Sequence, residues 1–197
     1  MAADGSGLTL LADAGSQPAW SPDGTRIAFL GASNQQGNVQ ISVVQPDGSG
    51  LTQLASVDGF SDYANGPVWS LDGTRITFIA CGAVGQTGCD IYVVDADGSA
   101  LRNLTNSAAD DREPAWSPDG ARIAFTSCSQ SCGVHVIEAD GSGLTLLADG
   151  SSFPAWSPDG TRIAFNGDGG IYVMNADGTG VTRVAEDGYN PAWQPRP

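Results

Sequence analysis

The sequence predicts an all-β fold, a β-propeller built from four-stranded antiparallel blades. The first observation is a phrase from Pro-Ala-Trp or Pro-Val-Trp to Phe, which occurs at 18–29, 67–78, 114–125 and 154–165. The second is a phrase in which an apolar run precedes Pro-Asp-Gly or Ala-Asp-Gly; it occurs at 41–54, 91–104, 134–147 and 171–184. Each phrase holds two short apolar runs around a turn, so a pair of phrases encodes four strands. Repeated four-stranded units are typical of propeller blades.

The repeats predict one array over residues 1–197. Complete repeats cover approximately 18–54, 67–104, 114–147 and 154–184, and half-repeats occur at 3–11 and 191–195. The first half-repeat carries only the fourth strand and the second only the first strand, so a fifth blade is split between the two ends of the chain. A small closed ring, a fragment of a larger ring and a ring completed by another chain are all compatible with this arrangement.

Within each repeat the strands are expected in the order Pro-Ala-Trp, Arg-Ile-Ala-Phe, Ile-Tyr-Val-Val and Leu-Thr-x-Leu. The Asp-Gly turns fit a type I turn followed by a left-handed glycine. The Trp residues are expected between neighbouring blades, where each buries on the order of 150–250 Å²; they are Trp20, Trp69, Trp116, Trp156 and Trp193. An Arg follows each turn Asp by three residues, which predicts a recurring Asp–Arg pair; these are Arg26, Arg75, Arg122 and Arg162.

The Ser-Pro-Asp-Gly turn followed by Arg-Ile-Ala-Phe resembles the TolB-type propeller repeat, a PD40 or WD40-like motif, and the resemblance covers nearly the whole chain. It implies a propeller of six or seven blades, usually outside the cytoplasm. Such propellers act as protein-binding modules or as domains attached to peptidases and other enzymes. The chain departs from this pattern in blade number, because it holds four complete repeats.

The spacing of the repeats predicts where a partner binds. The Trp-to-Phe distance is constant (20 to 29, 69 to 78, 116 to 125, 156 to 165), whereas the connections from the second to the third strand and between repeats vary in length. In an up-and-down blade these variable loops share one face, and loops on a rigid scaffold carry binding function. The candidate binding residues are Asp58, Asp62, Tyr63, Asn65, Asp110, Asp111, Arg112, Glu113, Phe153 and Tyr189. The alternative is that these loops differ in length without binding a partner, because surface loops accept insertions at low cost.

Each of two equivalent variable loops is flanked by a pair of cysteines. The first Cys of each pair lies three residues after the strand-two Phe, and the second lies two residues before the third strand. This register favours the disulfides Cys81–Cys89 and Cys128–Cys132 over the other pairings of four cysteines. A zinc site fits the spacing poorly. Disulfides imply an oxidising compartment, so an extracellular or periplasmic location is expected.

Composition narrows the classes of partner. The net charge is −14, and the cations are all Arg. Nucleic acid and anionic lipid need basic patches, so both are disfavoured. No apolar stretch is long enough for a membrane span, and residues 1–7 lack the features of a signal peptide. Because the chain begins within a repeat, a mature form or a segment of a longer protein is expected.

The sequence offers little for catalysis. His135 is the single histidine and occupies a repeat position filled elsewhere by Tyr92 or Tyr172, and a catalytic His needs a nucleophile and an orienting group within reach. Of the first strands, only the one preceded by Glu113 has an acidic neighbour. A self-contained enzyme is therefore not expected. No cofactor or metal is expected either, although Asp110, Asp111 and Glu113 could gather Ca²⁺ with Asp62.

These observations predict a non-enzymatic propeller scaffold that binds a protein or peptide through its variable-loop face. One alternative is a structural or assembly subunit that self-associates, its incomplete terminal blade being completed by another chain. The other is an accessory domain of a larger secreted enzyme. The stray half-repeats at 3–11 and 191–195 distinguish the assembly hypothesis from the other two.

Overall fold

The computed structural model describes residues 10–31, 38–58, 66–82 and 88–194, and within these ranges the regular structure is entirely β. Unit 1 holds β1 (Gly15–Trp20), β2 (Ile27–Gly31), β3 (Val39–Val44) and β4 (Thr52–Val57), and unit 2 holds β5 (Val68–Trp69), β6 (Arg75–Cys81), β7 (Cys89–Asp95) and β8 (Arg102–Asn103). Unit 3 holds β9 (Asp110–Trp116), β10 (Arg122–Cys128), β11 (Cys132–Glu138) and β12 (Thr145–Asp149), and unit 4 holds β13 (Ser152–Trp156), β14 (Arg162–Gly167), β15 (Gly170–Asn175) and β16 (Thr182–Ala185).

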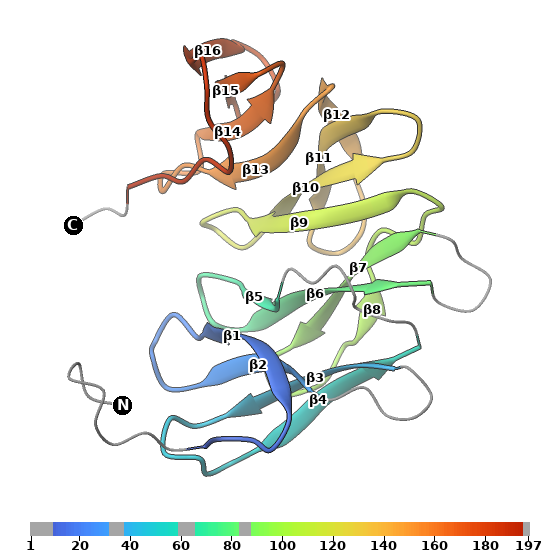
Figure 1. Ribbon diagram of the computed structural model, residues 1–197, viewed down its shortest axis with the longest axis vertical. Coiled ribbons are helices and arrows are strands. Elements are labelled where there is room, and N and C mark those ends of the chain that lie inside the picture. The colour runs from blue at the N-terminus through green and yellow to red at the C-terminus, as the bar shows by residue number, and fades with distance from the viewer. Residues whose placement is uncertain (1–9, 32–37, 59–65, 83–87, 195–197) are drawn as a thin grey trace.

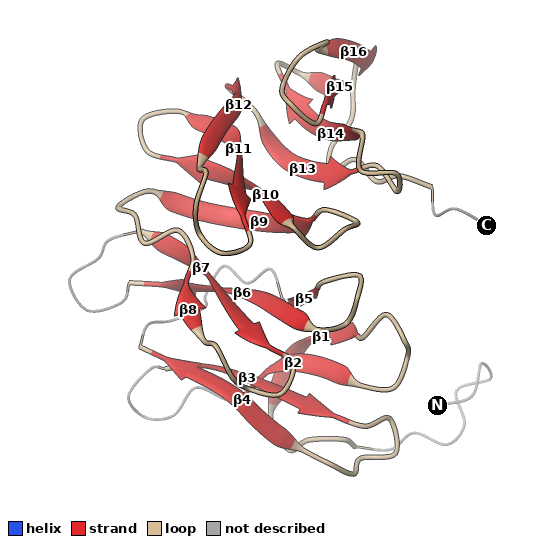
Figure 2. Cartoon of the chain, turned by 180° about the vertical axis from the view of Figure 1, so that it is seen from behind, coloured by secondary structure: helices blue, strands red, loops and turns tan. Residues whose placement is uncertain are grey.

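Each unit is an antiparallel sheet whose four strands pair in chain order, as the repeats predict. Units 2 and 3 are also joined by one parallel pair, Cys89 with Asp110, so they form a continuous sheet of eight strands. The units follow one another along an arc, with β1, β5, β9 and β13 on its concave side (Figure 1). The view from behind shows strands joined by loops throughout the described chain (Figure 2). None of the described residues forms a helix that is long and apolar enough to cross a membrane.

The Asp-Gly turns have the expected chemistry. In the first of them the Asp23 carboxylate accepts hydrogen bonds from the Ser21 hydroxyl at 2.6 Å and from the Thr25 amide at 3.0 Å. Gly24 follows with φ 69°, a left-handed conformation that glycine adopts without steric cost. The Ser21 hydrogen bond is the largest of the causes that lower the pKa of Asp23 to about 2.

The hydrophobic core lies between consecutive units. Side chains from β2 and β3 of unit 1, including Leu30 and Ile41, share a buried cluster with Trp69 and Phe78 of unit 2. Equivalent clusters join unit 2 to unit 3 and unit 3 to unit 4. Trp69, Trp116 and Trp156 are buried in these junctions as predicted, whereas Trp20 is 58% exposed on the side of unit 1 that faces no other described unit.

The recurring Arg has a different partner from the one predicted. Its guanidinium lies over the Trp ring of the following unit, at 5.0 Å for Arg26 and Trp69 and at 4.7 Å for Arg122 and Trp156. The turn Asp is instead held by local Ser hydroxyls and backbone amides. The ion pair described in this structure joins Asp110 to Arg112 at 3.2 Å. The delocalised guanidinium favours an aromatic face in a buried junction over a solvated carboxylate in a turn.

Both predicted disulfides are confirmed. Cys81 pairs with Cys89 across β6 and β7, and Cys128 pairs with Cys132 across β10 and β11, at directly opposed positions of each hairpin. Cys81 and Cys89 are buried in the junction between units 2 and 3, whereas Cys132 is exposed. The two bridges therefore close equivalent loops in different surroundings.

Candidate functional site

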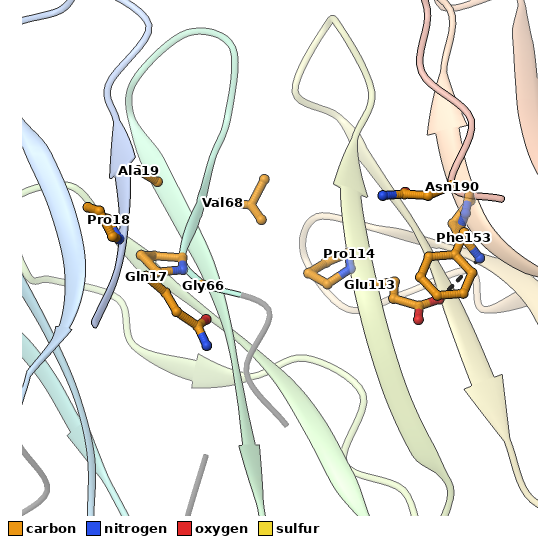
Figure 3. A pocket seen from close by; sticks show the side chains of 11 residues that line it. Gln17, Pro18, Ala19, Gly66, Val68, Glu113, Pro114, Phe153 and Asn190 are labelled. Atoms are coloured by element: carbon orange, nitrogen blue, oxygen red, sulfur yellow. Dashed lines mark hydrogen bonds between the residues drawn. The ribbon is translucent and has the colours of Figure 1, made fainter. Parts of the chain in front are cut away.

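The four inner strands converge on an open cavity of about 550 Å³ on the concave side of the arc. Each unit supplies the residues around the first Pro of its repeat, where a variable residue precedes that Pro. Figure 3 shows Gln17, Pro18 and Gly66 on one side of this cavity and Glu113, Phe153 and Asn190 on the other. The lining residues are Gln17, Pro18, Ala19, Gly66, Pro67, Val68, Glu113, Pro114, Phe153, Pro154 and Asn190. We call this cavity the concave pocket.

An unusual backbone conformation recurs at the rim of the concave pocket. Four of the five residues before the Pro of the repeat have positive φ values, of 53° at Gln17, 57° at Glu113, 54° at Phe153 and 55° at Asn190. Within the first strands the pairing register shifts at this point, as in β1 between Ser16 and Ala19. A left-handed non-glycine residue is strained, and such strain gathers at functional sites. The bulge sets the residue before Pro apart from the regular alternation of its strand.

The first proline of each repeat limits which kind of ligand can pair with the inner strand. Pro18 and Pro154 lie on β1 and β13, which are edge strands, and Pro67 directly precedes the edge strand β5. Pro114 lies on β9, four residues beyond the Asp110 position that pairs with β7. Proline has no amide hydrogen to donate to an added strand, so it blocks edge-to-edge pairing. The concave pocket is therefore suited to contacts through side chains rather than to the addition of a strand.

Two of the predicted binding residues, Glu113 and Phe153, line the concave pocket, and a third, Tyr189, contacts Phe153 from outside that lining. The Oε2 atom of Glu113 accepts hydrogen bonds from Thr126 Oγ1 at 2.5 Å and from the Phe153 amide at 3.1 Å. The Phe153 ring meets the ring of Tyr189 edge-on, with centroids 6.1 Å apart, and Tyr189 is 82% exposed. A carboxylate and one ring of an aromatic pair thus line one end of the pocket, and the second ring, Tyr189, lies beside them.

Other predicted binding residues lie elsewhere. Asp58 is exposed just beyond β4, and Asp62, Tyr63 and Asn65 lie outside the described residues. Asp110 and Arg112 pair with each other at the start of β9, and an Arg112 nitrogen also lies 3.6 Å from the sulfur of Cys89. These two side chains contribute to the junction between units 2 and 3.

Asp111 is a buried group of the same junction. It is 1% exposed, and its Oδ2 accepts a hydrogen bond from Ser107 Oγ at 2.8 Å. Its Oδ1 has no hydrogen-bond partner among the described residues. Burial is the first cause that raises the pKa of Asp111, and the nearby Asp90 carboxylate adds to it. Asp90 is also buried and accepts hydrogen bonds from Asn103, Thr105 and Ser107.

The carboxylates considered for Ca²⁺ have separate partners. Asp111 contacts Ser107, Asp110 contacts Arg112 and Glu113 contacts Thr126. The described part of the chain contains no group of three or more His, Cys, Asp or Glu side chains that could hold a metal ion. The fourth proposed ligand, Asp62, lies outside the described residues.

His135 occupies the repeat position that the sequence predicts for it. It stacks on Phe125 with ring centroids 5.7 Å apart, as Tyr172 stacks on Phe165, and its Nδ1 lies 3.1 Å from the Gly133 carbonyl oxygen. It is half-buried in β11 and absent from the lining of the concave pocket. These contacts are those of a packing residue.

Of the lining residues, the sequence predicted Glu113 and Phe153 but not the equivalent residues Gln17, Gly66 and Asn190 or the residues that follow them. Their sequence signal is the position before each Pro-Ala-Trp phrase, which holds Gln17, Gly66, Glu113, Phe153 and Asn190 in the five copies. Asn190 is tied to unit 4, since its amide donates to Asn166 Oδ1 at 3.0 Å. The residue before Pro varies in type, whereas the Pro-Ala-Trp or Pro-Val-Trp motif after it is nearly constant. This is the pattern expected of a binding site on a repeated scaffold.

Comparison with known proteins places this geometry in a wider group. The family model described as TolB beta propeller domain matches residues 16–152. No curated protein matches the chain. The solved structure of a putative TolB from Agrobacterium tumefaciens has a TM-score of 0.63 and 24% identity over 89% of this chain and 63% of its own.

Two further solved structures show how widely this fold is used. Oligogalacturonate lyase from Vibrio parahaemolyticus has a TM-score of 0.66 and 13% identity over 87% of this chain and 52% of its own. A structure of a nidogen/laminin complex has a TM-score of 0.62 and 15% identity over 83% of this chain and 62% of its own. The chain spans less than two thirds of all three structures. At these identities the likeness concerns the fold, which does not by itself specify function.

Proposed function

The chain belongs to the TolB β-propeller family, and from that premise we propose that it is a non-enzymatic scaffold that binds a protein or peptide in the concave pocket. The observation that carries this proposal is the convergence of all four units on one cavity. Four of its lining residues, each of a different type, have a left-handed backbone and directly precede the Pro of a repeat. One structural neighbour is a chain from a nidogen/laminin complex, which is an assembly of two proteins.

A binding role accounts for the lining better than a catalytic role does. Glu113 is the only acidic or basic side chain among the described lining residues, and one oxygen of its carboxylate already accepts hydrogen bonds from Thr126 and Phe153. General acid–base catalysis and nucleophilic catalysis both need a second group within reach. Because the fold is shared with a lyase, an assay on pectic oligosaccharides is a direct check; turnover that Glu113→Gln abolishes would contradict this part of the proposal.

The two disulfides favour a location outside the cytoplasm. Cys81–Cys89 and Cys128–Cys132 both close hairpins of the fold, and structural disulfides persist in oxidising compartments. We therefore place the binding function in an extracellular or periplasmic setting. Retention of both bridges in protein purified from a secreting host without added oxidant is the expected result.

Peptides selected from a random display library on the immobilised protein would test the proposal. We expect amide hydrogen exchange with a selected peptide bound to slow in β1, β9 and β13, where the inner strands approach the concave pocket. Slower exchange confined to the Asp-Gly turns on the opposite face would contradict the proposal. Failure of any peptide to bind more tightly than a scrambled version would also contradict it.

Self-association is a second candidate function, favoured by the exposure of Trp20. Its equivalents Trp69 and Trp116 donate Nε1–H to carbonyl oxygens of the preceding unit, Ala19 at 3.1 Å and Val68 at 3.3 Å. Trp20 is 58% exposed, and Val184 on the outermost strand of unit 4 is also 58% exposed. By repeat equivalence Trp20 would pack on a unit that precedes unit 1. On unit 4 the equivalent place is held by Trp193, whose Nε1–H donates to the Ala155 carbonyl oxygen at 2.9 Å, so a second copy of this chain would dock there by displacing Trp193. Light scattering should then show an oligomer that Trp20→Glu dissociates, and a monomer at all concentrations would exclude it.

A further inference from the structure

We propose that the concave pocket recognises a basic side chain of its partner, with the Glu113 carboxylate and the Phe153–Tyr189 aromatic pair forming the subsite. This inference rests on the proposed function, because it names the chemistry of the peptide that the pocket would hold. It concerns one end of the pocket, where Glu113, Phe153 and Asn190 lie together (Figure 3).

Charge is the first argument. Glu113 is the only acidic or basic side chain among the described lining residues, and the whole chain carries a net charge of −14 without a single lysine. The field of such a protein favours cationic ligands and disfavours anionic ones. The Arg side chains near the inner strands are also committed to other groups, since Arg26 and Arg75 stack on the Trp rings of the next unit.

The orientation of the carboxylate is the second argument. Thr126 Oγ1 and the Phe153 amide both donate to Oε2, so the Glu113 side chain is held in one position before a ligand arrives. Oε1 accepts none of the hydrogen bonds described in this structure, and in Figure 3 it points away from the contact with Phe153. A preorganised carboxylate with one oxygen available suits a charged N–H donor, because charge-assisted hydrogen bonds are the stronger kind.

The aromatic pair is the third argument. The Phe153 amide donates a hydrogen bond to the Glu113 carboxylate. The Phe153 and Tyr189 rings meet at an interplanar angle of 70°, and Tyr189 stays largely exposed. A cation near aromatic faces is stabilised by the ring quadrupole. The chain already uses this contact between its units, where Arg162 lies 5.0 Å from the Trp193 ring. A planar guanidinium can pair with a carboxylate and stack on a ring together, so Arg should bind better than Lys.

A titration with small probes tests the subsite directly. The probes are N-acetyl-arginine amide, its neutral isostere N-acetyl-citrulline amide, and N-acetyl-lysine amide, each followed by amide chemical shifts of the intact chain. We expect the arginine probe to bind at least 10-fold more tightly than the citrulline probe, with the lysine probe between them. Shifts should appear at Phe153 and Tyr189. Equal binding of the arginine and citrulline probes would overturn the inference.

Two variants that lose the same charge at different places distinguish binding at the subsite from attraction by the net negative charge of the protein. Glu113→Gln keeps an acceptor for the Phe153 amide and should remove the preference for the arginine probe. Glu138→Gln, at the exposed end of β11, makes the same change in net charge and should leave that preference intact. An equal loss in both variants would overturn the inference, because bulk charge would then explain the binding.

Tyr189→Ala tests the aromatic part of the subsite with little effect on folding, because Tyr189 is 82% exposed. We expect this variant to bind the arginine probe about 3-fold more weakly, because one exposed aromatic contact is lost. Its melting temperature should not change. Unchanged affinity would remove the aromatic half of the subsite. A separate titration with CaCl₂ alone tests for a metal site. Saturable shifts of the same resonances at low millimolar Ca²⁺ would assign Glu113 to a metal site and would overturn the inference.

These outcomes can be told apart from failure of the proposed function. If display-selected peptides slow exchange at the inner strands but contain no required Arg or Lys, and Glu113→Gln does not affect them, only the basic-residue inference fails. If no peptide binds in the concave pocket, the proposed function fails with it.

Discussion

Arg75 lies over the ring of Trp116, with its Cζ 4.8 Å from the ring centroid, so a side chain of unit 2 covers a side chain of unit 3. The same relationship joins Arg26 to Trp69, Arg122 to Trp156 and Arg162 to Trp193. Trp116 also donates Nε1–H to the carbonyl oxygen of Val68 at 3.3 Å. Each junction is thus held by one Arg and one Trp from adjacent units, in addition to the buried apolar cluster.

A double-mutant cycle on Arg75 and Trp116 should measure this contact. We expect Arg75→Gln and Trp116→Phe each to lower the free energy of unfolding, with a coupling energy of about 0.5–2 kcal/mol for a partly desolvated cation–π pair. Urea unfolding of the four proteins gives the values. Arg183→Gln is the control, because Arg183 lies on exposed β16 with its Cζ 6.0 Å from the Tyr172 ring. Additivity of the Arg75 and Trp116 effects would contradict the account.

The two disulfides should differ in their effect on stability. Their Cys residues are separated by 8 and 4 positions, so the entropy of loop closure gives each bridge at most about 2–3 kcal/mol. The pair Cys81→Ala and Cys89→Ala should cost more than the pair Cys128→Ala and Cys132→Ala. The reason is that Cys81 and Cys89 also pack in the core between units 2 and 3. Denaturant unfolding that gave the reverse order would contradict this.

Asp111→Asn should stabilise the protein at neutral pH. Burial raises the pKa of Asp111, so this carboxyl contributes stability below its unfolded pKa of 3.8 and loses it as the pH rises through the folded pKa. Asparagine keeps an acceptor for Ser107 without the buried charge. The variant should therefore melt higher than the wild type at pH 7, and the difference should vanish as the pH falls towards 3.8.

A neighbouring variant is the matched control for this pH series. Asp110→Asn removes an ion pair whose carboxylate is 43% exposed, and such pairs contribute less than about 1 kcal/mol. Its melting temperature at pH 7 should stay near that of the wild type. A lower melting temperature for Asp111→Asn at pH 7 would show that the charged form is favoured in the junction, contrary to the prediction.

Asp23→Asn should have the opposite dependence on pH. Hydrogen bonds from Ser21 and Thr25 lower the pKa of Asp23 from 3.8 to about 2, so its contribution to stability is present above pH 3.8 and is lost as the pH falls through about 2. The variant should melt below the wild type at pH 7, and the two should converge near pH 2. A constant difference in melting temperature across this range would show that the charge of Asp23 does not stabilise the turn.

The repeats were sufficient to predict the strands, the turns and both disulfides. Turn chemistry is local, and two equivalent Cys pairs share one register, as Cys81 with Cys89 and Cys128 with Cys132 confirm. The partner of Arg75 could not be predicted in the same way. The turn Asp72 is three residues away, whereas Trp116 is brought to it only by the packing of unit 3 on unit 2.

The candidate site was predicted in part. Glu113, Phe153 and Tyr189 stand out because they lie near variable loops, and the structure brings them together. Gln17 and Asn190 were missed because their place in the concave pocket depends on a left-handed backbone before Pro. That conformation has no signature in composition, since proline disfavours a right-handed helical residue before it but does not select a left-handed one.

Site-specific photo-cross-linking with a display-selected peptide would show which surface of the protein the partner contacts. A photoreactive phenylalanine analogue replaces Gln17 in the concave pocket, or Leu71, which is 58% exposed in the Ser-Leu-Asp-Gly turn on the opposite face. The account predicts a cross-link from position 17 that excess unlabelled peptide removes, and none from position 71. A competable cross-link from position 71 alone would contradict it, because the partner would then bind the face of the fixed turns.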